Sequence, residues 1–164
     1  MSLHPFGVKG FTLIELLVAL TILSILAAVS LPFVEITVIR TKELELHSAL
    51  REVRTAIDNF HEDWVNGKIS KTNNSVSEDG YPKTLQILVE GVERSIAKGG
   101  KNRYLRRIPS DPFSEKENKD PKDDWMIRGY QDELTSTVWG GHDVYDIRSM
   151  NDKVAIDGTH YRDW

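Results

Sequence analysis

Glu15 is the residue whose chemistry conflicts most with its surroundings. It is the single charge in residues 11–34, FTLIELLVALTILSILAAVSLPFV. A helix of this length spans roughly 36 Å, enough to cross a hydrocarbon core of about 30 Å, so the segment predicts a transmembrane helix. A carboxylate inside such a helix costs about 3 kcal/mol, which makes Glu15 a candidate functional residue. The alternative is that Glu15 lies near the helix end and reaches the headgroups.

No other group of residues forms a catalytic set. The chain has no nucleophile elbow, phosphate-binding glycine loop or paired-histidine metal helix, and its histidines are scattered. It also has no cysteine, which excludes disulfides and thiolate metal sites. The sequence therefore predicts that the protein is not an enzyme. A membrane-anchored enzyme or sensor is the alternative that this absence argues against.

The carboxylate must be positioned by a long helix. After the apolar segment, residues 35–64 keep apolar side chains at spacings of three and four, which predicts an amphipathic continuation. Pro32 is the one break between the two parts. It removes a single backbone hydrogen bond, so it predicts a kink within one helix from Phe11 to about Trp64.

The rest of the chain predicts a small mixed domain. Thr84 should cap a second helix that ends at Gly99-Gly100, and residues 104–113 should form an ordered turn. Residues 125–130 and 143–149 read as strands of a short antiparallel sheet. The predicted fold class is therefore α+β. A net charge of −4 gives no basic footprint, so nucleic acid is not an expected partner.

The N-terminus resembles the type IV pilin-like proteins. A short leader ends in Lys9-Gly10, and Phe11-Thr12-Leu13-Ile14-Glu15 then opens the apolar run. The resemblance implies that a prepilin peptidase cuts after Gly10 and methylates Phe11. It makes Glu15 the fifth residue of the mature chain, and it places Pro32 where many members carry a proline.

The later part resembles the major pseudopilins of type II secretion systems, in which a phrase like Tyr-Leu-x-x-x-Pro-x-Asp-Pro-Trp is common. Here that phrase is YLRRIPSDPF, ending at Phe113. The resemblance implies a single-pass inner-membrane protein with a leader (1–10), a membrane helix (11–34), its amphipathic continuation (35–64) and a periplasmic domain (65–164). It would assemble into a homo-oligomeric helical filament with minor pseudopilins and an inner-membrane assembly platform. The alternative is a type IV pilin for adhesion or motility.

The resemblance also implies a calcium ion in the acidic loop at residues 149–164. Asp152, Asp157 and Asp163 would be its carboxylate ligands, with Ser149 and main-chain carbonyls completing the six to eight oxygens that calcium needs. Lys153 and Arg162 lie beside these ligands. The alternative is a loop held by Asp–backbone turns and by packing of Trp164.

Overall fold

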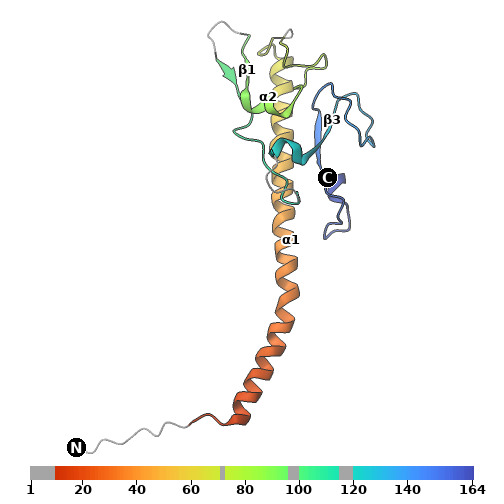
Figure 1. Ribbon diagram of the computed structural model, residues 1–164. Coiled ribbons are helices and arrows are strands. Elements are labelled where there is room, and N and C mark those ends of the chain that lie inside the picture. The colour runs from red at the N-terminus through yellow and green to blue at the C-terminus, as the bar shows by residue number, and fades with distance from the viewer. Residues whose placement is uncertain (1–9, 71–72, 96–99, 115–119) are drawn as a thin grey trace, which may run out of the picture. The chain divides into compact units, whose positions relative to one another are not determined.

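The computed structural model describes residues 10–164 except 71–72, 96–99 and 115–119, and it leaves the side chains of 29–34 undescribed. The chain divides into two units, residues 1–39 and 40–164. The longest element, α1 (Leu13–Val65), contributes to both units and is drawn from red to yellow in Figure 1. The predicted long helix is confirmed. The helical assignment runs through Pro32 without a break.

The C-terminal half of α1 forms one wall of the hydrophobic core. Its buried residues follow the predicted helical spacing. They are Leu46, Ala49, Leu50, Val53, Ala56, Ile57 and Phe60. Each large side chain among them contributes about 1.5–3 kcal/mol by leaving water. This stripe is what fixes the small domain on the helix.

The second helix, α2 (Leu85–Glu90), buries Leu85 and Leu88 against this core. It is shorter than the sequence predicts. Gly91 has φ +80°, a left-handed conformation that favours glycine, and an added Cβ there would lie 2.6 Å from the carbonyl oxygen of Asn102. Thr84 occupies the N-cap position, but its side chain makes no capping hydrogen bond, so that part of the prediction is wrong. The predicted stop at Gly99-Gly100 lies partly outside the described residues.

Two small antiparallel sheets complete the domain. Strand β1 (Val92–Glu93) pairs with β2 (Lys101–Asn102), and β3 (Trp125–Arg128) pairs with β4 (Asp146–Ser149). Short 3-10 turns precede β3 (Pro121–Asp124) and close the chain (Tyr161–Asp163). Figure 1 shows α2 and β3 beside the yellow end of α1. The predicted α+β class and the predicted pairing of the two later strands are confirmed.

Among the described residues, no helix is both long and apolar enough to cross a bilayer. The predicted membrane segment, 11–34, includes residues 29–34, whose side chains lie outside the described part.

Candidate functional site

The predicted cleavage junction lies just before α1. Gly10, Phe11 and Thr12 have no helical assignment, and the helix begins at Leu13. Thr12 caps the N-terminus of α1. Its carbonyl oxygen accepts from the Leu16 N–H at 3.1 Å, and its hydroxyl accepts from the Glu15 N–H at 3.3 Å. This is the N-cap interaction of a threonine three residues before a glutamate. The Gly10–Phe11 bond is therefore presented outside the helix.

Nothing in the fold requires glycine at position 10. A Cβ built on Gly10 meets no described atom within 4 Å, and its φ is not in the left-handed range. If glycine is needed here, the requirement comes from a protein that binds the junction.

Glu15 lies in the first turn of α1, where a carboxylate interacts favourably with the partial positive charge of the helix end. Its neighbours Leu13, Ile14, Leu16 and Leu17 are all at least half exposed. No cation among the described residues is paired with its carboxylate. The predicted assembly residue is thus a lone charge on an apolar surface.

Apart from Glu15, Thr21 and Ser24, the side chains of the first four turns of α1 are apolar, and the large ones are exposed. The large side chains between Leu13 and Leu26 are exposed all round the helix. The hydroxyls of Thr21 and Ser24 donate back to the carbonyl oxygens of Leu17 and Leu20, each at 2.8 Å. These bonds satisfy the two hydroxyl donors within the helix itself. A helix that is apolar all round belongs in a membrane or against other chains.

Pro32, the remaining predicted assembly residue, lies within α1, and its side chain is outside the described part of the chain. Its role stays a prediction.

The four predicted calcium ligands are each engaged with other partners. Ser149 is buried and its hydroxyl donates to Asp111 at 2.5 Å. Asp152 pairs with Arg162 at 3.0 Å. Asp157 accepts from the N–H and hydroxyl of Thr159. These are the contacts of Asp turns and ion pairs, as in the alternative interpretation of the loop.

Asp163, the last predicted ligand, lies 3.9 Å from the Arg162 guanidinium. Among the described residues, no group of three His, Cys, Asp or Glu side chains is arranged to hold a metal ion. The donor set therefore fits calcium poorly in this arrangement, and the calcium site stays a prediction.

The same loop is fastened to α1 by residues that the sequence analysis missed. Glu43 accepts from the Ile156 N–H at 2.8 Å and from the Tyr161 hydroxyl at 3.0 Å. Burial, together with this bond to Glu43, raises the pKa of Tyr161 to about 12. Arg54 donates to the carbonyl oxygens of Ile147 and Trp164 and pairs with Asp146 at 2.8 Å. A glutamate and an arginine on a helix surface give no sequence signal of such distant partners.

The turn at 104–113 connects the parts of the domain. Leu105 and Ile108 are buried, as predicted, and Phe113 is half-buried against the core, stacked on Tyr161 with ring centroids 4.1 Å apart. The Trp125 indole donates to the Pro109 carbonyl oxygen at 2.9 Å. Asp111 is buried, and burial raises its pKa even though Ser149 and the Phe113 N–H donate to it.

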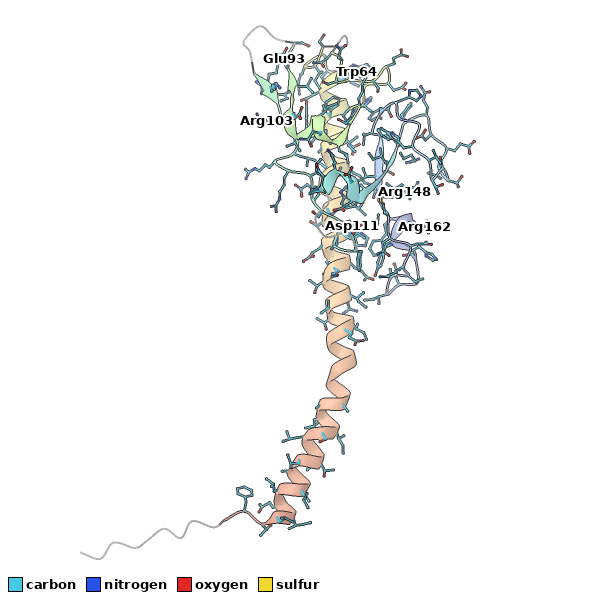
Figure 2. All side chains as sticks on the ribbon, viewed as in Figure 1. Trp64, Glu93, Arg103, Asp111, Arg148 and Arg162 are labelled. Atoms are coloured by element: carbon cyan, nitrogen blue, oxygen red, sulfur yellow. The ribbon has the colours of Figure 1, made fainter. Side chains whose placement is uncertain are left out.

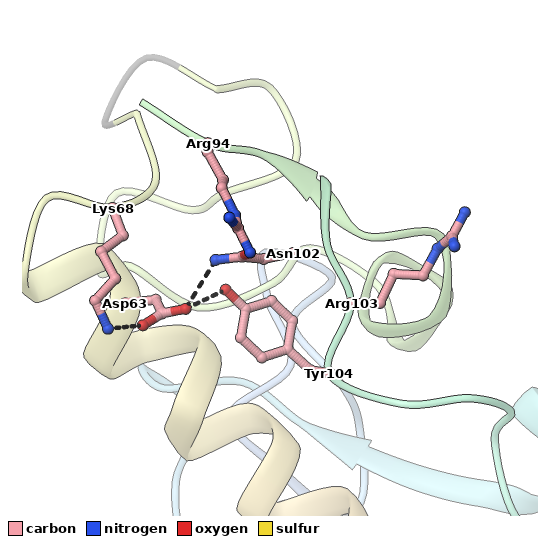
Figure 3. Close-up of a pocket in the computed structure, with 6 residues that line it drawn as sticks. All are labelled: Asp63, Lys68, Arg94, Asn102, Arg103 and Tyr104. Carbon is pink, nitrogen blue, oxygen red and sulfur yellow. Dashed lines mark hydrogen bonds and ion pairs between the residues drawn. The ribbon is translucent and has the colours of Figure 1, made fainter. Parts of the chain in front are cut away.

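A polar cavity of about 410 Å³ lies where this turn meets the end of α1 (Figure 3). Asp63 is its centre: it accepts from Lys68 at 2.6 Å, Tyr104 at 2.9 Å and Asn102 at 3.1 Å. Burial alone would raise the pKa of Asp63, but these donors and the Lys68 charge outweigh it and hold the pKa below its usual value. Burial and Asp63 together raise the pKa of Tyr104 far above normal. The cluster thus ties the end of α1 to the 101–104 segment.

Comparison with known proteins identifies the N-terminal segment. The family described as the prokaryotic N-terminal methylation motif matches residues 6–31. The matched segment contains Gly10, Phe11 and Glu15, and it indicates a type IV pilin-like protein that is processed by a prepilin peptidase. The motif is typical of membrane-anchored proteins that assemble at a surface. Neither curated proteins nor solved structures give a significant match to this chain.

Proposed function

We propose that the protein is a structural subunit of a type II secretion pseudopilus. It is anchored in the inner membrane by residues 11–34 and carries its C-terminal domain in the periplasm. The filament forms through the N-terminal helices, and its growth drives export of folded proteins. The observation that carries this proposal is the uncovered apolar start of α1, with its lone carboxylate directly behind the cleavage junction.

Cleavage would supply the partner that Glu15 lacks. Cutting after Gly10 frees an ammonium group on Phe11, four residues before Glu15 and just outside the first turn of α1. In a filament of staggered helices, the ammonium of one subunit would pair with Glu15 of the next, because an unpaired charge in an apolar filament core is costly.

Two features favour a pseudopilin over an adhesive pilin. The 104–113 turn, which resembles the major pseudopilin phrase, has buried Leu105 and Ile108 and links α1, β3 and the C-terminal loop. The chain also has no cysteine to close a C-terminal disulfide loop, as many adhesive pilins do. Minor pseudopilins, the prepilin peptidase, the assembly platform and the lipid bilayer are the implied partners.

The experiment is to delete the gene and complement it with the wild-type chain. We expect mass spectrometry of the membrane-extracted protein to show a chain starting at N-methyl-Phe11. We expect the deletion to block secretion of folded proteins without removing surface filaments. An intact leader in assembled protein would contradict the type IV pilin-like assignment.

The alternative is a major or minor type IV pilin, and the same strains separate it from the pseudopilin. Loss of extracellular filaments and of motility or adhesion, with normal secretion, would favour the pilin. Neighbouring genes for a secretion ATPase and an outer-membrane secretin, without a retraction ATPase, would favour the pseudopilin.

A further inference from the structure

The connection between β3 and β4 in the 40–164 unit exposes large apolar side chains. In this docking loop, residues 129–142, Leu134 is 68% exposed, Val138 74% and Tyr130 52%. A group of large apolar side chains held in water marks an interaction surface.

The docking loop is held in shape by its own hydrogen bonds. Asp132 accepts from the Gly129 N–H at 2.7 Å and from the Gly140 N–H at 3.1 Å. The Trp139 indole donates to the Asp143 carbonyl oxygen at 2.7 Å. The backbone is thus already ordered, and binding through its tip would cost little conformational entropy.

The opposite flank of the domain carries an open groove between α1 and residues 104–110. Two hollows of about 620 and 490 Å³ share Ser48 and Glu52 and so form one continuous surface. Apolar residues line its floor: Ala49, Ala56, Leu105 and Ile108. These apolar residues could take up aliphatic side chains of a partner.

The groove is lined by three exposed arginines and by two exposed glutamates, Glu45 and Glu52, so its lining carries a small positive excess. Arg51, Arg106 and Arg107 line it and are exposed. The side chains of these three arginines have no hydrogen bond or ion pair with another residue in the described ranges. A partner with apolar tips and adjacent carboxylates would complement it.

The docking loop carries apolar side chains with carboxylates next to them. Glu133 lies next to Leu134, and the loop contains no lysine or arginine. The hydrogen bonds from the Gly129 and Gly140 N–H groups hold the pKa of Asp132 below its usual value, so its carboxylate is charged at neutral pH. Both surfaces therefore present apolar side chains, and the acidic loop would meet Arg51, Arg106 and Arg107 in a groove that Glu45 and Glu52 also line.

We propose that the docking loop of one subunit inserts into the α1 groove of a second copy of this chain. Figure 2 shows Arg103, beside the groove segment, and Arg148, which donates to the Leu134 carbonyl oxygen, on opposite sides of α1. Two different surfaces on opposite flanks make a heterologous contact, which repeats from copy to copy instead of closing a dimer. This inference rests on the proposed filament function, and it assigns the domain surfaces that set the register between neighbouring subunits.

Disulfide trapping in the full chain, in its host, tests this contact. The natural chain has no cysteine, so every cross-link reports the introduced pair. Val138→Cys lies on the loop tip, and Thr55→Cys lies in the groove. We expect the double variant, under mild oxidation, to give a ladder of multimers. Each single variant should stay monomeric, because its cysteine would face no second thiol.

The outcomes separate this inference from the proposed function. If filaments form and secretion is normal but the double variant gives no ladder, the loop–groove contact is wrong and the proposed function stands. The loop–groove contact would also be overturned if either single variant gave efficient dimers and the double variant gave no multimers larger than a dimer. A wild-type chain that is neither processed nor assembled would overturn both.

A charge exchange provides a second measurement that does not depend on thiol chemistry. Glu133→Arg and Arg106→Glu should each reduce the amount of filament several-fold, because each places like charges at the contact. Combining the two substitutions should restore most of the filament. Lack of restoration in a double variant that is folded and processed would argue against the contact.

Discussion

At the scale of single residues, the processing junction and the assembly charge depend on a short stretch of backbone. Thr12 ends the non-helical segment and caps α1, so Gly10 precedes the helix while Glu15 lies in its first turn. Gly10 and Glu15 both belong to the 1–39 unit, which is separate from the 40–164 unit. Substitutions here should therefore change processing or assembly without changing the stability of residues 40–164.

Gly10→Ala tests the junction. We expect processing to fall strongly, because a peptidase that binds the Gly–Phe backbone closely would exclude a side chain, whereas the chain itself has room for a Cβ. Mass spectrometry of the membrane fraction should show the leader retained. Thr12→Ser, which keeps the capping hydroxyl, is the matched control and should be processed normally. Full processing of Gly10→Ala would contradict the role given to Gly10.

Glu15→Val tests the assembly charge. The variant should be cut and membrane-embedded, because the substitution makes the segment more apolar, but it should form no filament since the Phe11 ammonium of the neighbouring chain loses its partner. Glu15→Asp keeps the carboxylate and should retain part of the assembly. Electron microscopy and secretion assays provide the measurement. Normal filaments from Glu15→Val would mean that the carboxylate only reaches the headgroups.

At the scale of elements, the sequence was most informative where the contacts repeat along one helix. The stripe from Leu46 to Phe60 was predictable because helical periodicity places these residues on one face. The end of α2 was missed because apolar spacing continues past Gly91, while the backbone turns there to pair Val92 with Asn102. A pairing partner ten residues away leaves no periodic signal.

The candidate sites, too, were predictable where the signal is local in the sequence and not where it depends on distant contacts. The N-terminal motif is local and was readable in full, and its match over residues 6–31 confirms the type IV pilin-like signal. The links from Glu43 and Arg54 to the C-terminal loop join residues about a hundred positions apart. Such pairs depend on tertiary packing, which a single sequence does not encode as a pattern.

Phe60→Ala tests the packing of α1. Phe60 is fully buried, and its ring packs edge-on against Tyr104 with centroids 5.3 Å apart. Removing it should cost about 3–5 kcal/mol, from lost burial and the cavity left behind. Chemical denaturation of residues 40–164 gives the measurement. Asp58→Ala, at an exposed position of the same helix, should change stability by no more than about 0.5 kcal/mol. Equal effects of the two would contradict the assigned core face.

Asp63→Asn tests the polar link between α1 and the 101–104 segment. The folded pKa of Asp63 is lowered, so its charge stabilises the fold above the unfolded pKa of about 3.8, and that stability is lost as pH falls below this value. We expect the variant to lose about 1.5–3 kcal/mol at pH 7, the range for hydrogen bonds to a charged group. The difference from wild type should shrink towards pH 3. A loss that is constant with pH would show that the Asp63 charge does not contribute.

At the scale of the whole molecule, the two ends of the mature chain have different requirements. The apolar start of α1 needs a membrane or other subunits around it. The C-terminal loop is held within the domain by Glu43, Arg54 and stacking of Trp164 on His47, with ring centroids 4.0 Å apart. Because Glu43 and His47 lie near the start of the 40–164 unit, the loop secures α1 where it enters the domain.

Calcium binding by this loop is a prediction about global stability. An ion that binds only the folded state, at a hundred times its dissociation constant, adds about 2.7 kcal/mol. The prediction is that millimolar calcium raises the melting temperature of residues 40–164 by several degrees and that a chelator reverses the shift. Asp157→Asn should abolish the shift if Asp157 is a ligand, whereas Asp58→Asn, away from the loop, should leave it unchanged.

The ion would have to displace Thr159 from Asp157 and Arg162 from Asp152, so binding should also weaken the Asp152–Arg162 pair. A melting temperature that responds to neither calcium nor chelator would contradict the site. In that case Arg54→Ala, which removes three of the loop's and sheet's bonds to α1, should lower the melting temperature in calcium and in chelator alike.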